Sequence, residues 1–323
     1  MRALLLVGLA ACTKFEDPNI VIDTRVLAMK ATVPDQIVDV DLANPQDPVE
    51  LLDQLVPTTM CALVADPNFD RPLRYSLTLC VLNNDERCRE DGAKVVLAQG
   101  LLGDPDTTVP EPQMCGTVEP DGNLLGIVLE ALDGDVLQGL GGVDYGVALR
   151  VGGDGVDPAL DLFAGKTLRV SPRIPAARTA NTNPRVDHFD AAKDGVDPQP
   201  LPMGRCVDQT APLEIVPTQR VRITPVEPDG AREVYVVPTI DGKQETFTES
   251  LTYQWLAGGG SYSSGFTGGP RDVTGNPPPL FSDFRAPAAD EIDGVTDIPI
   301  WIVQRDERLG AEWYESCIRV VPE

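Results

Sequence analysis

His188 is the side chain best suited to act as a general base, because it is the single histidine of the 323-residue chain. Any Ser-His-Asp or Cys-His arrangement would have to use it. The chain contains no Gly-x-Ser-x-Gly motif to present a nucleophilic serine. One histidine also excludes a multi-histidine metal site. We therefore expect His188 to lie exposed or at a strand edge, and the chain to be non-enzymatic.

Two pairs of closely spaced aspartates, Asp39 with Asp41 and Asp133 with Asp135, could supply oxygen ligands to calcium. A complete calcium loop needs more ligands at fixed offsets and ends in a glutamate, which neither pair provides. Solvated acidic loops are the expected role, with calcium as the alternative. No other metal or cofactor is predicted. Paired carboxylates of a hydrolase stay an alternative, although only 5% of residues are aromatic and could line a sugar cleft.

The segment 258–269, Gly-Gly-Gly-Ser-Tyr-Ser-Ser-Gly-Phe-Thr-Gly-Gly, is glycine-rich enough to suggest a phosphate-binding loop. It lacks the Gly-Lys-Ser/Thr ending of such loops, and no strand-then-helix pattern surrounds it. We interpret it as a flexible loop of a β-sandwich. Binding by this loop is the alternative, since loops on a rigid scaffold often carry recognition.

The chain has seven cysteines, and six remain when Cys12 is set aside. An even number favours disulfides in an exported protein, and six cysteines allow about 15 pairings. No two of them have the CxxC spacing of zinc ribbons or redox motifs. A small loop closed within 80–88 is favoured by its short span, and the pairs would then be Cys80–Cys88, Cys61–Cys115 and Cys206–Cys317.

Cys12 ends an apolar run from Ala3 to Ala11 that follows Met-Arg. The run is about half the length of a membrane-spanning helix and fits the apolar region of a signal peptide. Its end, Leu-Ala-Ala-Cys, resembles the lipobox of bacterial lipoproteins. The resemblance implies a signal peptide at 1–11, a lipid-bearing Cys12 and a tether over 12–19. Thr13 stands where an aspartate would mark inner-membrane retention, which implies the outer membrane, facing the periplasm or the cell surface.

The net charge is −24 at pH 7, from 50 acidic and 26 basic residues. A surface this negative repels nucleic-acid phosphates, so nucleic acid is not an expected partner. It also repels anionic lipid headgroups, so membrane attachment would have to come from the lipid anchor. Envelope proteins or glycans are the remaining expected partners.

Short strands separated by turn residues dominate the rest of the chain, and 30 prolines and 29 glycines leave little room for long helices. Short helical turns are expected at 49–55 and 136–140, and the loop-rich stretch 176–213 places the domain junction near residue 180. The strands expected in the first half are 20–33, 61–65, 74–82, 124–129, 145–151 and 166–170. Those expected in the second half are 185–191, 213–216, 220–226, 233–237, 251–256, 299–305 and 312–321.

The last 75 or so residues carry a more specific resemblance. Leu251-Thr-Tyr-Gln-Trp is followed by Phe284-Arg-Ala-Pro, by a strand ending in Arg305-Asp306, and by a closing strand with Trp313. The pattern resembles immunoglobulin-like (Ig-like) domains of the PKD or cadherin-like sort. The chain as a whole is similar to two-domain Ig-like envelope lipoproteins of myxobacteria. In those proteins, too, a strand with the sequence Arg-Val-Leu-Ala follows the lipid anchor, as residues 25–28 do here.

The resemblance implies a mostly β protein with two Ig-like β-sandwiches in tandem, at 20–178 and 179–323. All three tryptophans lie in the second half of the chain, and their positions within expected strands favour packing in the core. The expected function is a non-enzymatic cell-envelope adhesion, scaffold or binding module. The alternatives are a calcium- or glycan-binding surface protein that uses the second-domain loops, and an envelope hydrolase.

Overall fold

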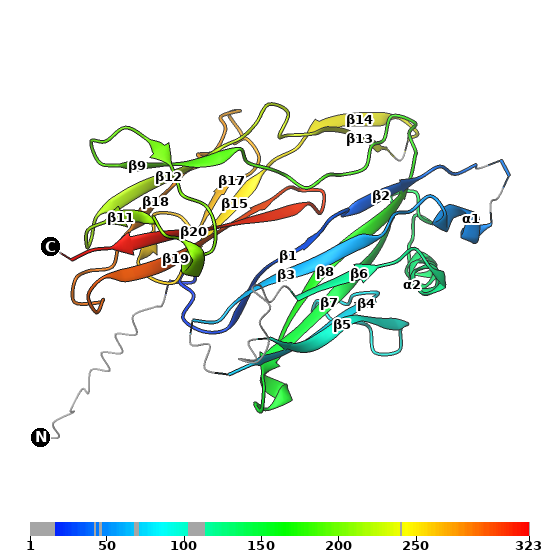
Figure 1. The fold of residues 1–323 in the computed structure, drawn as a ribbon. Coiled ribbons are helices and arrows are strands. Elements are labelled where there is room, and N and C mark those ends of the chain that lie inside the picture. Colours follow the sequence, from blue (N-terminus) through cyan, green and yellow to red (C-terminus); the bar gives the residue numbers. More distant parts are fainter. Residues whose placement is uncertain are drawn as a thin grey trace, which may run out of the picture.

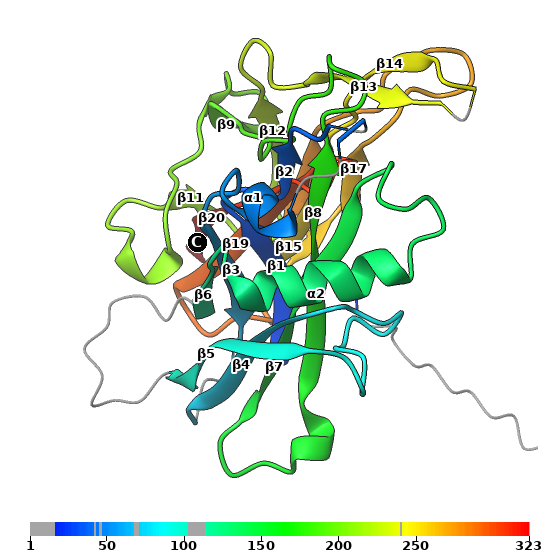
Figure 2. The same ribbon diagram turned by 90° about the vertical axis from the view of Figure 1, so that its right-hand side faces the viewer.

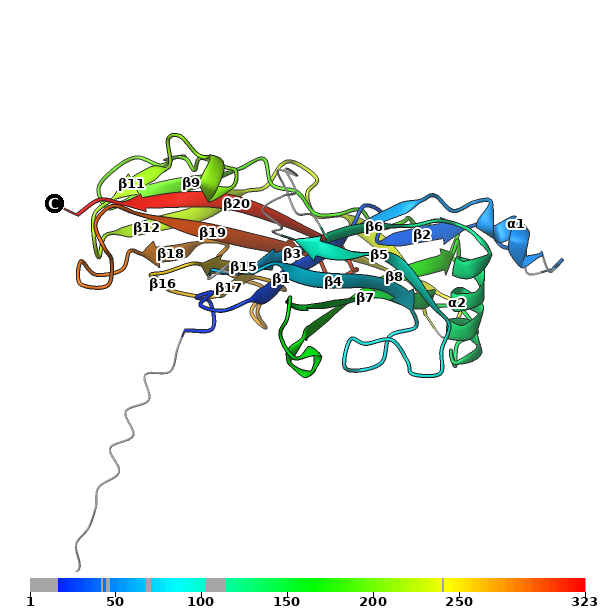
Figure 3. The same ribbon diagram turned by 60° about the horizontal axis from the view of Figure 1, so that its bottom comes forward.

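A computed structural model describes residues 17–41, 43–44, 47–67, 71–102, 114–239 and 241–322. These residues form two β-sandwiches placed end to end (Figures 1 and 3). The predicted fold class, mostly β with two Ig-like sandwiches in tandem, is confirmed. The expected signal peptide at 1–11 and the expected lipidation site, Cys12, lie outside the described residues.

The first sandwich pairs a three-stranded sheet with a five-stranded sheet. The chain changes sheets at Pro34, which lacks an N–H donor and separates β1 from β2. The smaller sheet has the order β1 (Arg25–Ala31), β3 (Thr58–Ala65), β6 (Met114–Val118). The larger sheet has the order β2 (Asp35–Val38), β8 (Leu162–Pro172), β7 (Val143–Gly153), β4 (Leu73–Cys80), β5 (Lys94–Leu102).

Two helices, α1 (Pro48–Leu52) and α2 (Gly122–Asp133), cover the end of the first sandwich that is remote from the second (Figures 1 and 2). The sequence-based assignment of 124–129 to a strand is wrong. Asp121 caps α2 by accepting hydrogen bonds from the N–H groups of Asn123 and Leu124. Leu124 and Ile127, one helical turn apart, enter the core. The run is apolar throughout, so its periodicity could not separate helix from strand.

The predicted turn at 136–140 forms hydrogen-bonded turns and no helix. The core of the first sandwich is filled by fully buried side chains from both sheets and from α2, among them Met60, Leu77, Met114, Ile127 and Leu149. A short 3-10 helix, η1 (Pro158–Leu160), lies between β7 and β8, at the opposite end of these strands from α2.

The second sandwich pairs two five-stranded sheets, and a separate hairpin extends from it on the side of the first sandwich (Figure 1). One sheet has the order β10 (Gln199–Pro200), β9 (His188–Lys193), β12 (Arg220–Val226), β18 (Ser282–Arg285), β16 (Ser261–Tyr262). The other has the order β11 (Leu213–Ile215), β20 (Ala311–Val320), β19 (Thr296–Arg305), β15 (Thr252–Ala257), β17 (Phe266–Gly268). The hairpin is β13 (Val234–Pro238) with β14 (Gln244–Thr248).

The glycine-rich segment 258–269 is structured, which corrects its interpretation as a loop. Its residues form β16 and β17, which complete one edge of each sheet. Gly260 has a φ of +81°, and a Cβ there would lie 2.5 Å from the carbonyl oxygen of Arg285. Only glycine tolerates that backbone conformation and that close approach. The glycines therefore serve the strand geometry.

Three disulfides form, between the same pairs that the sequence analysis expected. Cys61–Cys115 joins paired positions of β3 and β6, and Cys80–Cys88 closes a short loop after β4. Cys206–Cys317 joins the 3-10 helix η2 (Cys206–Asp208) to β20 across 111 residues of sequence. In the chain-entropy model, closing a loop of that length stabilises the folded state by about 4.7 kcal/mol.

Candidate binding site at the domain junction

An apolar cluster joins the two sandwiches. Leu27 and Ala28 of β1 lie buried against Leu256 of β15 and Val303 of β19. A β-bulge at this point of β1 lets two consecutive side chains serve the junction. The cluster gives the two domains a shared core, and further contributions come from Val21, Leu63, Ala65, Trp301 and Trp313.

The segment before β1 is bound to the second sandwich. Ile20 forms a parallel bridge with Ala257, and the N–H of Val21 donates to the carbonyl oxygen of Ala257 at 2.8 Å. In return, the N–H of Ala257 donates to the carbonyl oxygen of Asn19 at 3.0 Å. Ile20 and Val21, the first residues of the expected first domain, therefore pair with β15 of the second sandwich. The second sandwich thus holds the chain that leads into the first.

Polar contacts surround the apolar junction. The ammonium of Lys30 pairs with Glu312 and lies 4.2 Å from the ring centroid of Trp313. Lys166 of β8 donates to the carbonyl oxygen of Leu309, in the turn between β19 and β20. Burial lowers the pKa of Lys166 to about 8. Asn183, in the linker, donates to the carbonyl oxygen of Ala31 at 2.6 Å.

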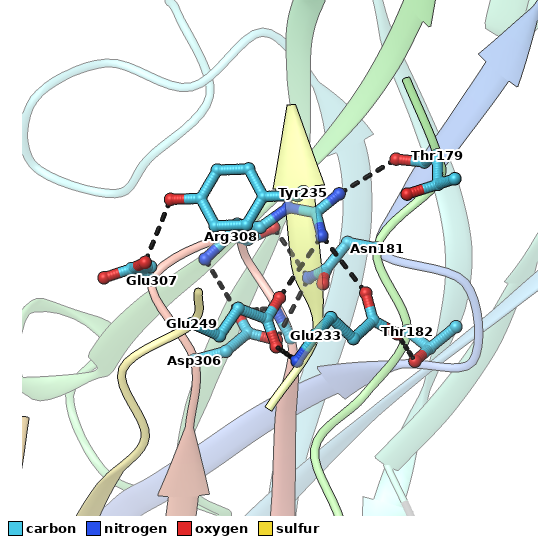
Figure 4. A network of polar contacts seen from close by, with 10 residues as sticks. Thr179, Asn181, Thr182, Glu233, Tyr235, Glu249, Asp306, Glu307 and Arg308 are labelled. Carbon is cyan, nitrogen blue, oxygen red and sulfur yellow. Dashed lines mark hydrogen bonds and ion pairs between the residues drawn. The ribbon is translucent and has the colours of Figure 1, made fainter. Parts of the chain in front are cut away.

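The β19–β20 turn, residues 306–310, is the centre of a polar network (Figure 4). The carboxylate of Asp306 accepts hydrogen bonds from the N–H groups of Arg308 and Gly310, each at 2.7 Å, and from the amide of Asn181 at 3.0 Å. These bonds fix the turn and aim the side chain of Arg308 at the linker and the hairpin. The Arg-Asp turn expected from the Ig-like resemblance therefore orders this network.

Arg308 binds two carboxylates and a carbonyl (Figure 4). Its Nη1 lies 3.1 Å from Glu233 and 3.3 Å from Glu249, and its Nη2 donates to the carbonyl oxygen of Thr179 at 2.9 Å. The guanidinium also lies 4.4 Å from the ring centroid of Tyr235. A single cation thus ties the interdomain linker to the β13–β14 hairpin and to its base.

Glu249 is the most buried carboxylate of this network, with 1% of its side chain exposed. It accepts a hydrogen bond from the N–H of Glu233 at 3.1 Å and shares Arg308 with the carboxylate of that residue. Burial is the main cause that raises the pKa of Glu249 to about 7, and the negative charges of Asp306 and Glu233 act in the same direction. The hydrogen bond from the N–H of Glu233 and the charge of Arg308 oppose this rise.

Glu249 also lines a cavity of about 510 Å³ beside the base of the hairpin. This volume falls in the range of roughly 300–1,000 Å³ that ligand pockets occupy. The cavity lies among loops of the second sandwich, and Arg271 stands exposed on it. The residues that line it are Glu227, Arg232, Thr248, Glu249, Ser250, Gly269, Arg271, Pro277, Pro278 and Leu280.

The second carboxylate of the cavity, Glu227, is held by protein donors. Arg232 binds both of its oxygens at 3.0 Å, and the hydroxyl of Tyr253 donates to it at 2.8 Å. Tyr253 is hydrogen-bonded in turn to Gln304, and Gln304 to Tyr314, in the core. The oxygens of Glu227 and Glu249 are therefore held by protein donors at the wall of this cavity.

The structure separates the residues that the sequence analysis considered for chemistry. His188 begins β9 at the surface, with Nε2 3.4 Å from Asp190. Asp39 pairs with Arg173, while Asp135 accepts from the N–H groups of Leu137 and Gly139 as a turn acceptor. Across the described residues, no group of three or more His, Cys, Asp and Glu side chains converges as a metal site would require.

One tryptophan is fully buried and the other two are partly buried. Trp255 is fully buried and donates through Nε1 to the hydroxyl of Thr267 at 2.8 Å, while Trp301 and Trp313 pack at the domain junction. Sequence reasoning missed Glu227, Glu249 and Arg308. Among 50 acidic residues nothing marks these two glutamates, and only the adjacent Arg-Asp turn signalled the surroundings of Arg308.

No protein-family model matches the chain, and no curated protein matches it. Among solved structures, fibronectin(III)-like modules of Clostridium thermocellum CbhA share 8% identity over 93% of this chain and 94% of theirs, with a TM-score of 0.21. A partial N-terminal region of enterococcal surface protein shares 7% identity over 93% and 97%, with a TM-score of 0.23. The collagen adhesin of S. aureus shares 9% over 91% and 92%, with a TM-score of 0.15. TM-scores this low carry no conclusion about function, and the fold assignment rests on the strand pairing above.

The protonation of Glu249 predicts how stability depends on pH. The pKa of its carboxyl rises from 4.5 to about 7 on folding, so between these values the folded chain keeps a proton that the unfolded chain has lost. The free energy of unfolding should therefore fall as pH rises through this window, by at most about 1.4 kcal/mol per pH unit. Glu249→Gln should remove this component, as measured by urea unfolding at about pH 5 and about pH 7.5.

The matched control is Glu245→Gln, which changes an exposed carboxylate on β14 and should leave the pH dependence intact. An unchanged slope in Glu249→Gln would show that this buried carboxyl does not hold the extra proton.

Proposed function

We propose that this chain is a non-enzymatic binding module of the cell envelope, anchored by lipid on Cys12. The observation that carries the proposal is the shared apolar core of the two sandwiches, around Leu27 of β1 and Val303 of β19. A hinge is expected between domains joined by a small polar interface. Here an apolar cluster and the Arg308 network join them instead, as suits a rigid body that displays the 510 Å³ cavity.

The disulfides support localisation outside the cytoplasm. Six cysteines form three disulfides, and such bonds persist in oxidising compartments such as the periplasm and the cell surface. None of the described helices has the length and apolarity to cross a membrane. The net charge of −24 opposes adsorption to anionic headgroups, so an acylated Cys12 is the attachment that fits this surface.

The cavity of the second sandwich supports a role in recognition. It combines two pre-paired carboxylates with an exposed guanidinium, Arg271, on loops that the strands hold in place. Polar groups that neighbouring side chains hold in place suit a ligand with many hydrogen-bonding groups, such as an envelope glycan or a polar protein segment.

Replacing Cys12 tests the proposed attachment to the membrane. Cys12→Ala removes the thiol that lipidation requires, so the chain should leave the membrane fraction or accumulate with its leader uncut. Cell fractionation and mass spectrometry of the N-terminus measure both outcomes, with the unchanged chain as the control. Mature Cys12→Ala chain that still sediments with membranes would contradict the anchor.

Blocking the cavity tests recognition. Thr248→Trp places a large side chain at the cavity, whereas Thr246→Trp adds the same bulk to the same strand outside it. The unchanged chain should bind isolated cell envelope saturably, and Thr248→Trp should weaken that binding by about tenfold or more, with Thr246→Trp unaffected. A sedimentation assay measures both. Equal binding by all three proteins, or release of soluble sugar or peptide from the envelope, would contradict a non-enzymatic role for this cavity.

A further inference from the structure

The tip of the first sandwich carries an apolar groove of about 290 Å³, lined by none of the residues of the cavity described above. We call it the tip groove. It lies between α1, α2 and the ends of β7 and β8. None of the residues that line it is charged, and Gln138 is its one amide side chain. Its walls include Val38, Leu52, Leu125, Leu129, Leu140 and Val170.

Helix α2 has more apolar surface than the sandwich covers. Leu124 and Ile127 enter the core, whereas Leu125, Val128 and Leu129 line the groove. Leu129 remains 44% exposed and Leu140 43% exposed. A surface helix normally keeps its apolar residues on one buried face, and a contiguous exposed patch marks an interaction surface. Leu125 and Val128 are partly buried against the core and also line the groove, so the apolar surface of α2 that stays uncovered is centred on Leu129.

The rim of the tip groove is acidic. Exposed carboxylates stand on α1 at Glu50, just after it at Asp53, and at the last residue of α2, Asp133. The last turn of α2 has no basic residue, although a helix C-terminus favours cations. The nearby cation Arg173 is paired with Asp39. Asp133 is thus placed against the helix dipole, with the guanidinium of Arg89 near the following residue, Gly134. Arg178 is engaged by the carbonyl oxygens of Leu140 and Gly141.

The charge of the protein and the volume of the tip groove indicate which kind of molecule binds there. A second copy of the chain would bring another −24 charge to an acidic rim, and anionic lipid would be repelled in the same way. The volume, about 290 Å³, lies just below the range of roughly 300–1,000 Å³ for small-molecule pockets. We propose that the tip groove binds a short segment of another protein in which a few apolar side chains are flanked by lysine or arginine.

The position of the groove suits this role. The described chain begins at Asp17 beside the second sandwich, and α1 and α2 lie at the opposite end of the molecule (Figures 1 and 3). An anchor preceding Asp17 would leave the tip groove facing outward. The inference goes beyond the proposed function, because a basic apolar segment could bind at this tip with or without an anchor on Cys12.

The test uses a fluorescein-labelled synthetic peptide with three leucines between two lysine pairs, read by fluorescence anisotropy against the purified chain. Two matched peptides replace the lysines by glutamates or the leucines by serines. The chain should bind the first peptide about tenfold or more tightly than either matched peptide, with binding that weakens as salt increases. Equal binding of the glutamate peptide would overturn the charge argument.

Variants of the chain locate the peptide. Leu129→Glu, on α2, should weaken binding about tenfold or more, whereas Leu160→Glu should not. Leu160 is 71% exposed at the opposite end of β7 and β8, which makes it a matched control. Leu140→Glu changes the groove from a turn instead of a helix, and it should also weaken peptide binding about tenfold or more. It replaces Leu129→Glu in the test if thermal melting shows the helix variant to be unfolded.

Three outcomes would overturn the proposal. One is unchanged peptide binding by folded Leu129→Glu and Leu140→Glu. Another is a dimer of the unchanged chain, detected by light scattering and abolished by Leu129→Glu, which would make a second copy the occupant. The third is binding of the chain to neutral phosphatidylcholine vesicles that Leu129→Glu abolishes, which would make lipid the occupant. Failure of the Cys12 or cavity experiments would leave each of these results unaffected.

Discussion

Strand β1 is shared by both sandwiches, and the rest of the molecule depends on that sharing. Met29 and Ala31 pack into the core of the first sandwich, while Leu27 and Ala28 pack against the second. The bulge in β1 makes this division of side chains geometrically feasible. Because one strand belongs to two cores, rotating one sandwich against the other would expose apolar surface from both.

The polar network at the junction requires the same placement. Arg308 reaches Glu233, Glu249 and the carbonyl of Thr179 only when turn, hairpin and linker are assembled together. Arg308 opposes the rise that burial causes in the pKa of Glu249, so a partly assembled junction would bury this carboxyl without the cation that offsets its charge. The apolar cluster and this network therefore reinforce each other, and they hold the cavity and the tip groove at fixed positions on one body.

Local patterns in the sequence predicted much of the fold. Contacts between residues that are far apart in the sequence could not be predicted. Tyr253 and Trp255 lie on a buried strand, as the resemblance to Ig-like domains implied, and the short span between Cys80 and Cys88 identified a loop that a disulfide closes. Helix α2 was missed because its apolar run has no distinguishing period. The Arg308–Glu249 pair joins residues 59 apart in sequence, and no local pattern records such a contact. The same holds for the tip groove, which is assembled from both helices and the ends of three strands, β2, β7 and β8.

The most direct test of a rigid two-sandwich body is a distance measurement between the domains by double electron–electron resonance. Spin labels would be attached at Leu160→Cys in the first sandwich and Val196→Cys in the second, two exposed positions, in a chain that also carries Cys12→Ser. A shared core predicts a single, narrow distribution of distances between the labels. A broad or bimodal distribution would mean that the sandwiches move independently, and it would contradict the account.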